Sequence, residues 1–256
     1  MKKYNTLTKT ILIFFTAYIV FGAFLYLSQQ NLIYHPTPTN PQDCTQLSQQ
    51  THKNTTFYYH SQNTDTATIL YHGNAGNACQ RAIYKDIVSP DTSLVIVEYT
   101  AYREQNKIPS KQNMLQDAKN IADWQNITNY TNINIIGESL GTSIASYHSN
   151  HAQVNTLILL NPFYSLQRLA RTHYPLYPSF LLTETYNTRQ YLEGFTGNIT
   201  ILHAEQDQIV PPLQSQKLKD SLTNATVQRQ KFPRETHNSL LTNLDVQAII
   251  RNLTAT

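Results

Sequence analysis

The sequence has little charge: only 14% of its 256 residues are Asp, Glu, Lys or Arg, and the formal net charge is +3. The Lys and Arg residues are scattered rather than gathered on one face, which argues against a nucleic-acid-binding surface. Internal repeats and low-complexity tracts are also lacking. Hydrophobic residues still make up 40% of the chain, which is enough for a sizeable core and excludes a largely disordered protein. The length suits one domain with an appendage.

One segment near the N-terminus has no charge at all. Residues 11–27 form an uninterrupted apolar run, which as a helix rising ~1.5 Å per residue would span roughly 26 Å, near the lower limit for crossing a bilayer. A cleavable signal peptide is the alternative, but its apolar core usually has only ~7–15 residues and ends in a small-x-small site. We therefore expect an uncleaved signal-anchor in residues 1–28.

The lysines predict how this anchor is oriented. Lys2, Lys3 and Lys9 precede the apolar run, and no further lysine occurs before Lys53. Positive residues stay on the cytoplasmic side of a membrane, so residues 1–28 read as a cytoplasmic tip with a single transmembrane helix. The rest of the chain is expected outside the cytoplasm, on the periplasmic or cell-surface side. Residues 29–50 read as a linker, in which Pro36, Pro38 and Pro41 favour extended backbone.

Residues 51–256 alternate short apolar runs with helical patterns, which predicts a doubly wound α/β domain with a mostly parallel sheet. Strands are expected at residues 68–71, 94–97, 133–136, 157–160, 199–202 and 226–232, and helices at residues 77–88, 111–125, 140–150, 212–222 and 239–253. Proline and aromatic residues between 163 and 193 predict a small cap in place of a further sheet layer.

Glycine is scarce, and its placement is informative. Four of the seven glycines directly follow predicted strands: Gly73, Gly76, Gly137 and Gly141. The last two belong to Gly137-Glu-Ser-Leu-Gly141, a G-x-S-x-G motif between a strand and a helix. In that context the motif forms a sharp turn that exposes the serine oxygen above the sheet. Ser139 is therefore the candidate nucleophile.

A serine hydroxyl needs a base, which in turn needs an orienting acid. On this fold the order along the chain is nucleophile, acid, base. His237 lies on the loop after the predicted strand at residues 226–232, and Asp207 lies on the loop after the strand that ends near His203. Glu205 is the local competitor of Asp207. The sequence predicts a triad of Ser139, Asp207 and His237.

The segment His72-Gly-Asn-Ala-Gly-Asn77 follows the first core strand. A glycine-rich turn there frees backbone amides, so the amides of Asn74 and Leu140 are expected to stabilise the oxyanion of a tetrahedral intermediate. A phosphate-cradling loop is the alternative, but the Lys-Ser/Thr ending of a P-loop and the spacing of a dinucleotide fingerprint are both missing.

These motifs together resemble the α/β-hydrolase superfamily, in particular small serine hydrolases with one N-terminal membrane segment. That group is related to palmitoyl-protein thioesterase-like and serine aminopeptidase-like abhydrolase proteins. The likeness rests on Leu32-Ile-Tyr-His-Pro36, residues 72–77, residues 137–141, Asn161-Pro-Phe-Tyr-Ser165, His203-Ala-Glu-Gln-Asp207 with Val210-Pro211, and His237-Asn238.

Carried over to these positions, the resemblance implies the same triad and oxyanion amides, and the segment at residues 32–36 looks like the strand that leads into the domain. The chain departs from the group in two places: Tyr99-Thr-Ala-Tyr-Arg103 replaces a glycine-containing turn, and Ala204 replaces a glycine. Neither departure removes a reacting atom, but the first leaves the rim of the substrate pocket undefined.

The expected activity is hydrolysis of esters or thioesters of a small-molecule or acylated substrate through an acyl-enzyme, without metal or cofactor. Two alternatives stay open: peptide or amide cleavage by the same triad, and a catalytically silent envelope protein that binds a partner. An oxidising compartment would let Cys44 and Cys79, which are the only cysteines, form a disulfide, and the alternative is two free thiols. The sequence predicts no oligomeric state.

Overall fold

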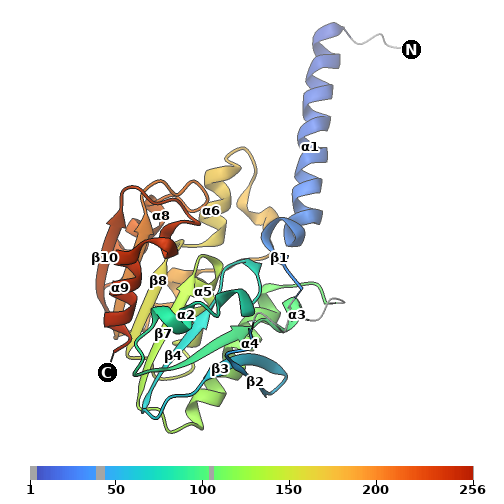
Figure 1. Ribbon diagram of the computed structural model, residues 1–256. Coiled ribbons are helices and arrows are strands. Elements are labelled where there is room, and N and C mark those ends of the chain that lie inside the picture. The colour runs from blue at the N-terminus through green and yellow to red at the C-terminus, as the bar shows by residue number, and fades with distance from the viewer. Residues whose placement is uncertain (1–4, 39–43, 104–106, 256) are drawn as a thin grey trace.

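A computed structural model describes residues 5–38, 44–103 and 107–255 of the chain. Three residues named above, Lys2, Lys3 and Pro41, lie outside these ranges. A long N-terminal helix leads into a domain in which helices cover a large central sheet (Figure 1).

The central sheet has eight strands in the order β10-β9-β8-β7-β4-β6-β3-β2. Two neighbouring pairs are antiparallel, β2 with β3 and β3 with β6; the other neighbours run parallel. The bounds are β2 Ser48–His52, β3 Thr55–His60, β4 Thr66–Tyr71, β6 Ser93–Glu98, β7 Asn132–Glu138, β8 Thr156–Leu160, β9 Asn198–Ala204 and β10 Thr226–Phe232. The six predicted strands are all present, and the mostly parallel sheet confirms the predicted fold class.

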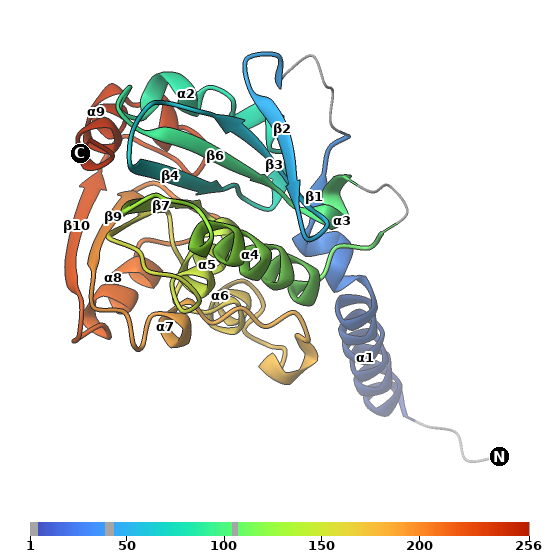
Figure 2. The same ribbon diagram turned by 90° about the horizontal axis from the view of Figure 1, so that it is seen from below.

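The continuous apolar runs arise because the central strands are buried on both faces. Ile69 and Ile135 point into one core, while their neighbours Leu70 and Ile136 point into the other. Helices α4 (Lys111–Asn126), α5 (Leu140–His148) and α8 (Leu213–Asp220) cover the first face, and α2 (Tyr84–Ile87) and α9 (Leu244–Leu253) cover the second (Figure 2). This is the doubly wound arrangement.

Three predicted elements differ in detail. The helix expected at residues 77–88 is broken into η2 (Cys79–Arg81) and α2, and Asn77 caps the first piece by accepting a hydrogen bond from the Gln80 amide. The helix expected at residues 239–253 divides into η4 (Leu240–Thr242) and α9, because the Asn243 side chain accepts the amides of Asp245 and Val246 and starts a new helix.

The third difference lies in the segment expected to lead into the domain as a strand. Residues 32 and 33 belong to the last turn of helix α1 (Thr6–Ile33), and only β1 (His35–Pro36) is extended. It pairs in parallel with β5 (Ala75–Gly76), outside the main sheet. The helix thus runs past residue 28, where the anchor was expected to end, because Gln29 makes hydrogen bonds with the domain that hold this part of α1 against it.

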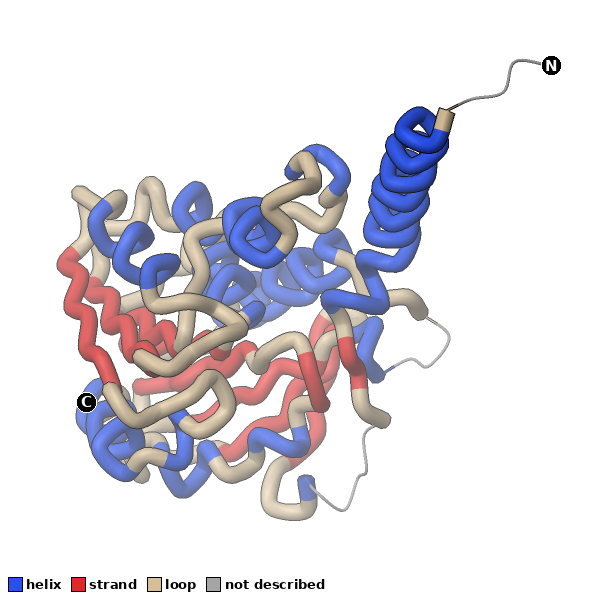
Figure 3. The backbone as a smooth tube through the Cα atoms, turned by 90° about the horizontal axis from the view of Figure 1, so that it is seen from above, coloured by secondary structure: helices blue, strands red, loops and turns tan. Residues whose placement is uncertain are grey.

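Helix α1 is, in the ranges described, the one helix whose length and composition would let it cross a membrane. Its N-terminal half projects away from the domain (Figures 1 and 3). The cap comprises α6 (Leu166–His173), η3 (Ser179–Leu181) and α7 (Thr188–Tyr191); η3 contacts the other half of α1, and α7 packs on α5. Helix α3 (Thr100–Arg103) follows β6.

Candidate active site

Ser139 lies in a sharp turn between β7 and α5. Its backbone has φ 49° and ψ −113°, a left-handed conformation that non-glycine residues seldom adopt. The two flanking glycines are needed for space: a Cβ on Gly137 would lie 2.6 Å from the Thr142 Cα, and one on Gly141 would collide with the carbonyl oxygens of Tyr71 and His72. The Ser139 amide donates to the carbonyl of Leu160 at the end of β8 (2.9 Å).

His237 lies on the turn after β10, and its side chain reaches the serine. The Nε2 atom lies 3.1 Å from Ser139 Oγ, and the Nδ1 atom lies 2.6 Å from Asp207 Oδ2. Both distances fall within the range of hydrogen bonds. The three residues, 98 positions apart at the extremes, are therefore brought into one chain of contacts, in the order that nucleophilic catalysis requires.

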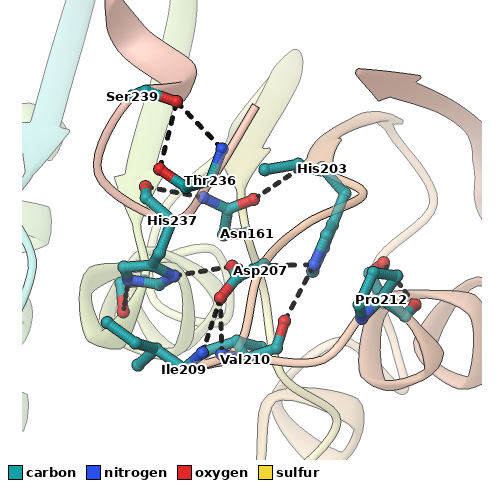
Figure 4. A network of polar contacts seen from close by, with 12 residues as sticks. Asn161, His203, Asp207, Ile209, Val210, Pro212, Thr236, His237 and Ser239 are labelled. Carbon is teal, nitrogen blue, oxygen red and sulfur yellow. Dashed lines mark hydrogen bonds and ion pairs between the residues drawn. The ribbon is translucent and has the colours of Figure 1, made fainter. Parts of the chain in front are cut away.

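Asp207 is fixed by its own loop (Figure 4). Its Oδ1 atom accepts the amides of Ile209 (2.9 Å) and Val210 (2.8 Å), and its side chain is fully buried. With Oδ1 occupied by two backbone donors, Oδ2 is left to accept from His237. An acceptor in this position holds the imidazole with the proton on Nδ1, which leaves Nε2 free to take a proton from Ser139.

Asn161 holds the loop that carries His237, and sequence reasoning assigned it no role. Its Nδ2 atom donates to the carbonyl of His237 (3.1 Å) and its Oδ1 atom accepts the Ala204 amide (2.9 Å), so it joins β8, β9 and the histidine loop (Figure 4). Its φ of 50° turns the chain at the end of β8. The available signal was an asparagine directly after a predicted strand, where left-handed backbone is tolerated.

Glu205, the competitor for the acid position, lies elsewhere. Its carboxylate pairs with Lys231 at 2.9 Å, and both side chains are partly exposed. His203 is buried in β9 and donates from Nε2 to the carbonyl of Val210 (3.0 Å). Burial lowers the pKa of His203 to about 4, with Arg229 acting in the same direction and Asp207 opposing it. His203 is therefore a neutral neighbour of Asp207.

The turn proposed to supply an oxyanion amide is held rigidly. The carbonyl of Asn74 accepts from the His35 amide (2.9 Å) and from the Tyr102 hydroxyl (2.6 Å), and its side chain donates to the carbonyl of Ile33 (2.7 Å). Leu140 is the first residue of α5, so its amide has no acceptor within the helix. Asn74, Ser139 and Leu140 line one cavity.

The segment that departs from the resembled group supports this turn. Tyr99 donates its hydroxyl to the carbonyl of His72 (2.7 Å), and its ring lies 4.3 Å from that of His72. Tyr102 supports Asn74 in the same way. Burial lowers the pKa of His72 to about 3, so this residue also stays neutral. The hydroxyls of Tyr99 and Tyr102 thus hold the turn at residues 72–74 from its outer side.

Glu138, the variable residue of the G-x-S-x-G turn, links this turn to the segment that carries the disulfide bond of the protein. It accepts hydrogen bonds from Arg81 Nε (2.7 Å) and the Tyr84 hydroxyl (2.7 Å). Two residues before Arg81, Cys79 forms a disulfide with Cys44. The segment after α1 is thereby linked, through the disulfide and Arg81, to the turn that carries Ser139.

A cavity of about 260 Å³ opens above Ser139. Its lining is mainly apolar and comes from the elbow, the cap and the C-terminal part of α1, with Asn74 from the turn after β4 and Ile209 and Val210 from the loop of Asp207. Across the described ranges no group of three or more His, Cys, Asp or Glu side chains is arranged to hold a metal ion.

Comparisons with known proteins agree with this architecture. An uncharacterized protein of Mycobacterium tuberculosis is 27% identical over 157 residues, which cover 59% of this chain and 56% of that protein. Lysophosphatidylserine lipase ABHD12 of Gallus gallus is 29% identical over 167 residues, covering 56% of this chain and 44% of the lipase. The chain thus spans about half the length of these curated relatives. No protein-family profile matches the chain.

Among solved structures, the Pyrococcus furiosus esterase Pf2001 superposes with a TM-score of 0.64 over 85% of this chain and 96% of the esterase, at 11% identity. At this identity the likeness establishes the fold alone. Together with the sheet order and the strand–serine–helix turn, it confirms that the chain has the α/β-hydrolase fold. Membership of the smaller membrane-anchored group stays a prediction.

Proposed function

We propose that this chain is a serine hydrolase that cleaves carboxylic ester or thioester bonds through an acyl-enzyme. The observation that carries the proposal is the chain of contacts from Ser139 Oγ to His237 Nε2 (3.1 Å) and from His237 Nδ1 to Asp207 Oδ2 (2.6 Å), at the floor of an apolar cavity. The lipase and esterase names among the relatives and neighbours support ester hydrolysis over the other reactions that this fold hosts.

In the first half-reaction Ser139 Oγ attacks the carbonyl carbon while its proton passes to His237 Nε2. The tetrahedral intermediate collapses, the bond to the leaving oxygen or sulfur breaks, and His237 gives the proton to that atom. Water then attacks the acyl-enzyme, loses a proton to His237, and the carboxylic acid leaves as the proton returns to Ser139. Asp207 stays ionised and stabilises the imidazolium in both halves.

The oxyanion that forms twice in this cycle needs fixed donors. The amides of Asn74 and Leu140 are the proposed pair, since both residues line the cavity beside Ser139 and the Asn74 turn is immobilised by three hydrogen bonds. One such donor is worth about 3–4 kcal/mol of barrier.

The membrane assignment is part of the proposal: residues 1–28 as cytoplasmic tip and anchor, 29–50 as linker, 51–256 as an extracytoplasmic hydrolase domain with a cap at about 163–193. Retention of α1 is favoured over cleavage by Gln29, whose buried side chain bonds to the cap. Alkaline phosphatase fused after residue 60 should be active and β-galactosidase at the same place silent; the reverse pattern would refute the orientation.

A fluorophosphonate probe tests the chemistry, because it reacts only with an activated serine. The unsubstituted protein should be labelled and Ser139→Ala should not, with turnover lowered by roughly 10⁶. Ser143→Ala is the matched control: this serine lies on the same elbow helix, is buried, and has no hydrogen-bond partner for its hydroxyl within the described ranges. It should keep labelling.

A substrate panel separates the remaining readings. Esters and thioesters from acetyl to palmitoyl should be cleaved faster than matched peptide amides. Amide hydrolysis at equal or higher rates would replace the esterase by a peptidase. If the unsubstituted, folded protein were not labelled at all, the chain would be a catalytically silent binding protein.

A further inference from the structure

The cap lies directly against helix α1. The rings of Tyr18 and Tyr177 stack at 4.7 Å with an interplanar angle of 8°. Tyr18 donates its hydroxyl to the carbonyl of Leu176 (2.9 Å), and Tyr177 donates to the carbonyl of Tyr18 (3.2 Å). One turn further along, Gly22 lets the Tyr177 ring approach the helix backbone, since an added Cβ would lie 3.2 Å from a ring carbon.

A second contact fixes the same face of α1 lower down. Gln29 is 8% exposed, and its Oε1 atom accepts the amides of Thr183 (2.7 Å) and Glu184 (3.3 Å). Its Nε2 atom donates to the carbonyl of Leu181 (3.4 Å). The spacing from residue 18 to 22, 25 and 29 is that of one helical face. The cap therefore follows this face for about three turns.

These contacts make α1 a wall of the cavity above Ser139. Four of its residues line that cavity: Leu25, Gln29, Leu32 and Ile33. The cap faces them with Tyr177, Leu181 and Leu182. The volume of about 260 Å³ lies just below the range of about 300–1,000 Å³ that encloses drug-sized ligands, and therefore suits one acyl chain rather than two.

The cap segment at residues 174–182 has the composition of a membrane-inserted loop. Its sequence, Tyr-Pro-Leu-Tyr-Pro-Ser-Phe-Leu-Leu, has no charged residue, yet Leu176 and Phe180 are 78% and 79% exposed. Tyr18, which it contacts, lies within the charge-free run of residues 11–27, and about 14 Å before its end at ~1.5 Å per residue. A bilayer that contains this run would therefore also surround the segment.

Backbone polar groups must be satisfied inside an apolar layer, and many in this segment are. The amides of Tyr177, Leu181 and Leu182 donate to carbonyls within it. The carbonyls of Leu176 and Leu181 accept from side chains of α1, and its two prolines carry no amide hydrogen. The loop thus uses the helix to reduce the cost of leaving water.

We propose that α1 and residues 174–182 together form the acyl-chain site, and that this segment enters the apolar layer of the membrane. The substrate is then an acyl ester held in the bilayer, whose single chain slides between helix and cap to reach Ser139 without crossing water. This inference rests on the proposed function. It makes the anchor a specificity-determining part of the enzyme as well as its attachment.

The role of α1 as a wall of the acyl-chain site is tested with the chain of residues 1–256 in phospholipid nanodiscs. Leu25→Trp fills the cavity from α1 and should lower kcat/KM for decanoyl relative to acetyl esters at least about tenfold, since each excluded methylene group costs discrimination of this order. Leu27→Trp is the matched control, because Leu27 is 79% exposed and does not line the cavity. It should leave the ratio unchanged.

The outcomes separate the two proposals. Absence of fluorophosphonate labelling in the unsubstituted protein would contradict the hydrolase assignment. Normal labelling, with the same decanoyl-to-acetyl ratio of kcat/KM in Leu25→Trp and Leu27→Trp, would contradict only the proposal that α1 forms a wall of the acyl-chain site.

Insertion is measured independently, in variants that leave the cavity lining intact. Phe180→Trp should be quenched by lipids brominated on their acyl chains, whereas Leu244→Trp, at an equally exposed position on α9, should not. The native Trp124, which packs on Phe57, gives the background to be subtracted. Equal quenching at both positions, or none at Phe180→Trp, would overturn insertion.

Discussion

The floor and the roof of the cavity are built in different ways. The floor consists of turns at the ends of parallel strands. Ser139 and Asn161 are held there by hydrogen bonds with the ends of β8 and β9, and Asp207 by amides of its own loop. The roof consists of α1 and the cap, where large apolar side chains are exposed and polar contacts are few: Gln29 provides most of them.

On the two proposals above, the floor carries out the reaction and the roof selects the substrate. In the proposed mechanism the groups that move protons must keep their geometry to within fractions of an ångström, and in the floor hydrogen bonds to buried side chains hold them. A surface that admits a flexible acyl chain from an apolar layer needs apolar side chains that can change their conformation. Substitutions in the floor should therefore change rates by orders of magnitude, and substitutions in the roof should change substrate affinity modestly.

The largest effect expected within the floor beyond loss of the nucleophile concerns the acid. Asp207→Asn should lower kcat by up to ~10⁴, because the amide no longer holds His237 in the required tautomer. Glu205→Gln, two residues away on the same loop, should change kcat little, since Glu205 pairs with Lys231 on the surface. Steady-state kinetics of both variants decide the assignment, and a more damaging Glu205→Gln would reverse it.

The disulfide links the segment after α1 to η2, next to the Asn74 turn, and its loss should be the next largest effect. Cys44 and Cys79 are 35 residues apart, and a loop of that size stabilises the folded state by about 3–4 kcal/mol on the chain-entropy model. The double variant Cys44→Ala/Cys79→Ala should show that loss in urea unfolding, while labelling of Ser139 in the folded state persists. An unchanged free energy of unfolding, or two free thiols in unreduced protein from the native compartment, would contradict the bridge.

A buried histidine at the end of α5 should make the stability of the domain sensitive to acid. Burial lowers the pKa of His148 to about 3, and its ring is held between the Tyr71 hydroxyl (2.7 Å) and Gln125 Oε1 (2.8 Å). The unfolded chain takes up this proton near pH 6.5 and the folded protein does not. Stability present above pH 6.5 is therefore lost as the pH falls, by about 2 kcal/mol at pH 5.

Urea unfolding at pH 7 and pH 5 measures this loss. His148→Gln should remove about 2 kcal/mol of the difference between the two pH values. The exposed cap histidine gives the control in the roof: His173→Gln should leave the difference as it is. Identical pH dependence in the unsubstituted protein and His148→Gln would show that His148 does not carry the effect.

The sequence predicted the floor better than the roof, and periodicity explains why. Strands buried on both faces are continuous apolar runs, so β4, β6, β7, β8 and β9 were found within two residues of their bounds. The antiparallel strands β2 and β3 were missed: β2, in the stretch expected to be mostly linker, is Ser-Gln-Gln-Thr-His with little burial, and lacks any apolar signal. The elbow was located because scarce glycines marked it.

The sequence did not predict hydrogen bonds between residues that lie far apart along the chain. Asn161 joins the histidine loop through a bond 76 residues away, and Gln29 reaches Thr183 across 154 residues. A glutamine at the end of an apolar run reads as a boundary residue, because nothing local reveals the backbone amides that it satisfies. For the same reason the linker was expected to begin at residue 29, whereas the helix continues to Ile33.

The smallest effect is expected from Gln29 itself, and it tests whether the roof merely selects. Gln29→Leu keeps the size of the side chain but leaves the amides of Thr183 and Glu184 without their acceptor. An unsatisfied buried donor costs about 1–3 kcal/mol, and the cap can relieve much of that by loosening toward water. We therefore expect KM for medium-chain esters to rise about fivefold, equivalent to roughly 1 kcal/mol of binding, with kcat unchanged.

Gln30→Leu is the control, since in the described chain only its backbone carbonyl is engaged outside the helix, by the Tyr34 amide. A fall in kcat for Gln29→Leu with KM unchanged would mean that the roof holds the reacting groups as well, and the division between the two regions would fail.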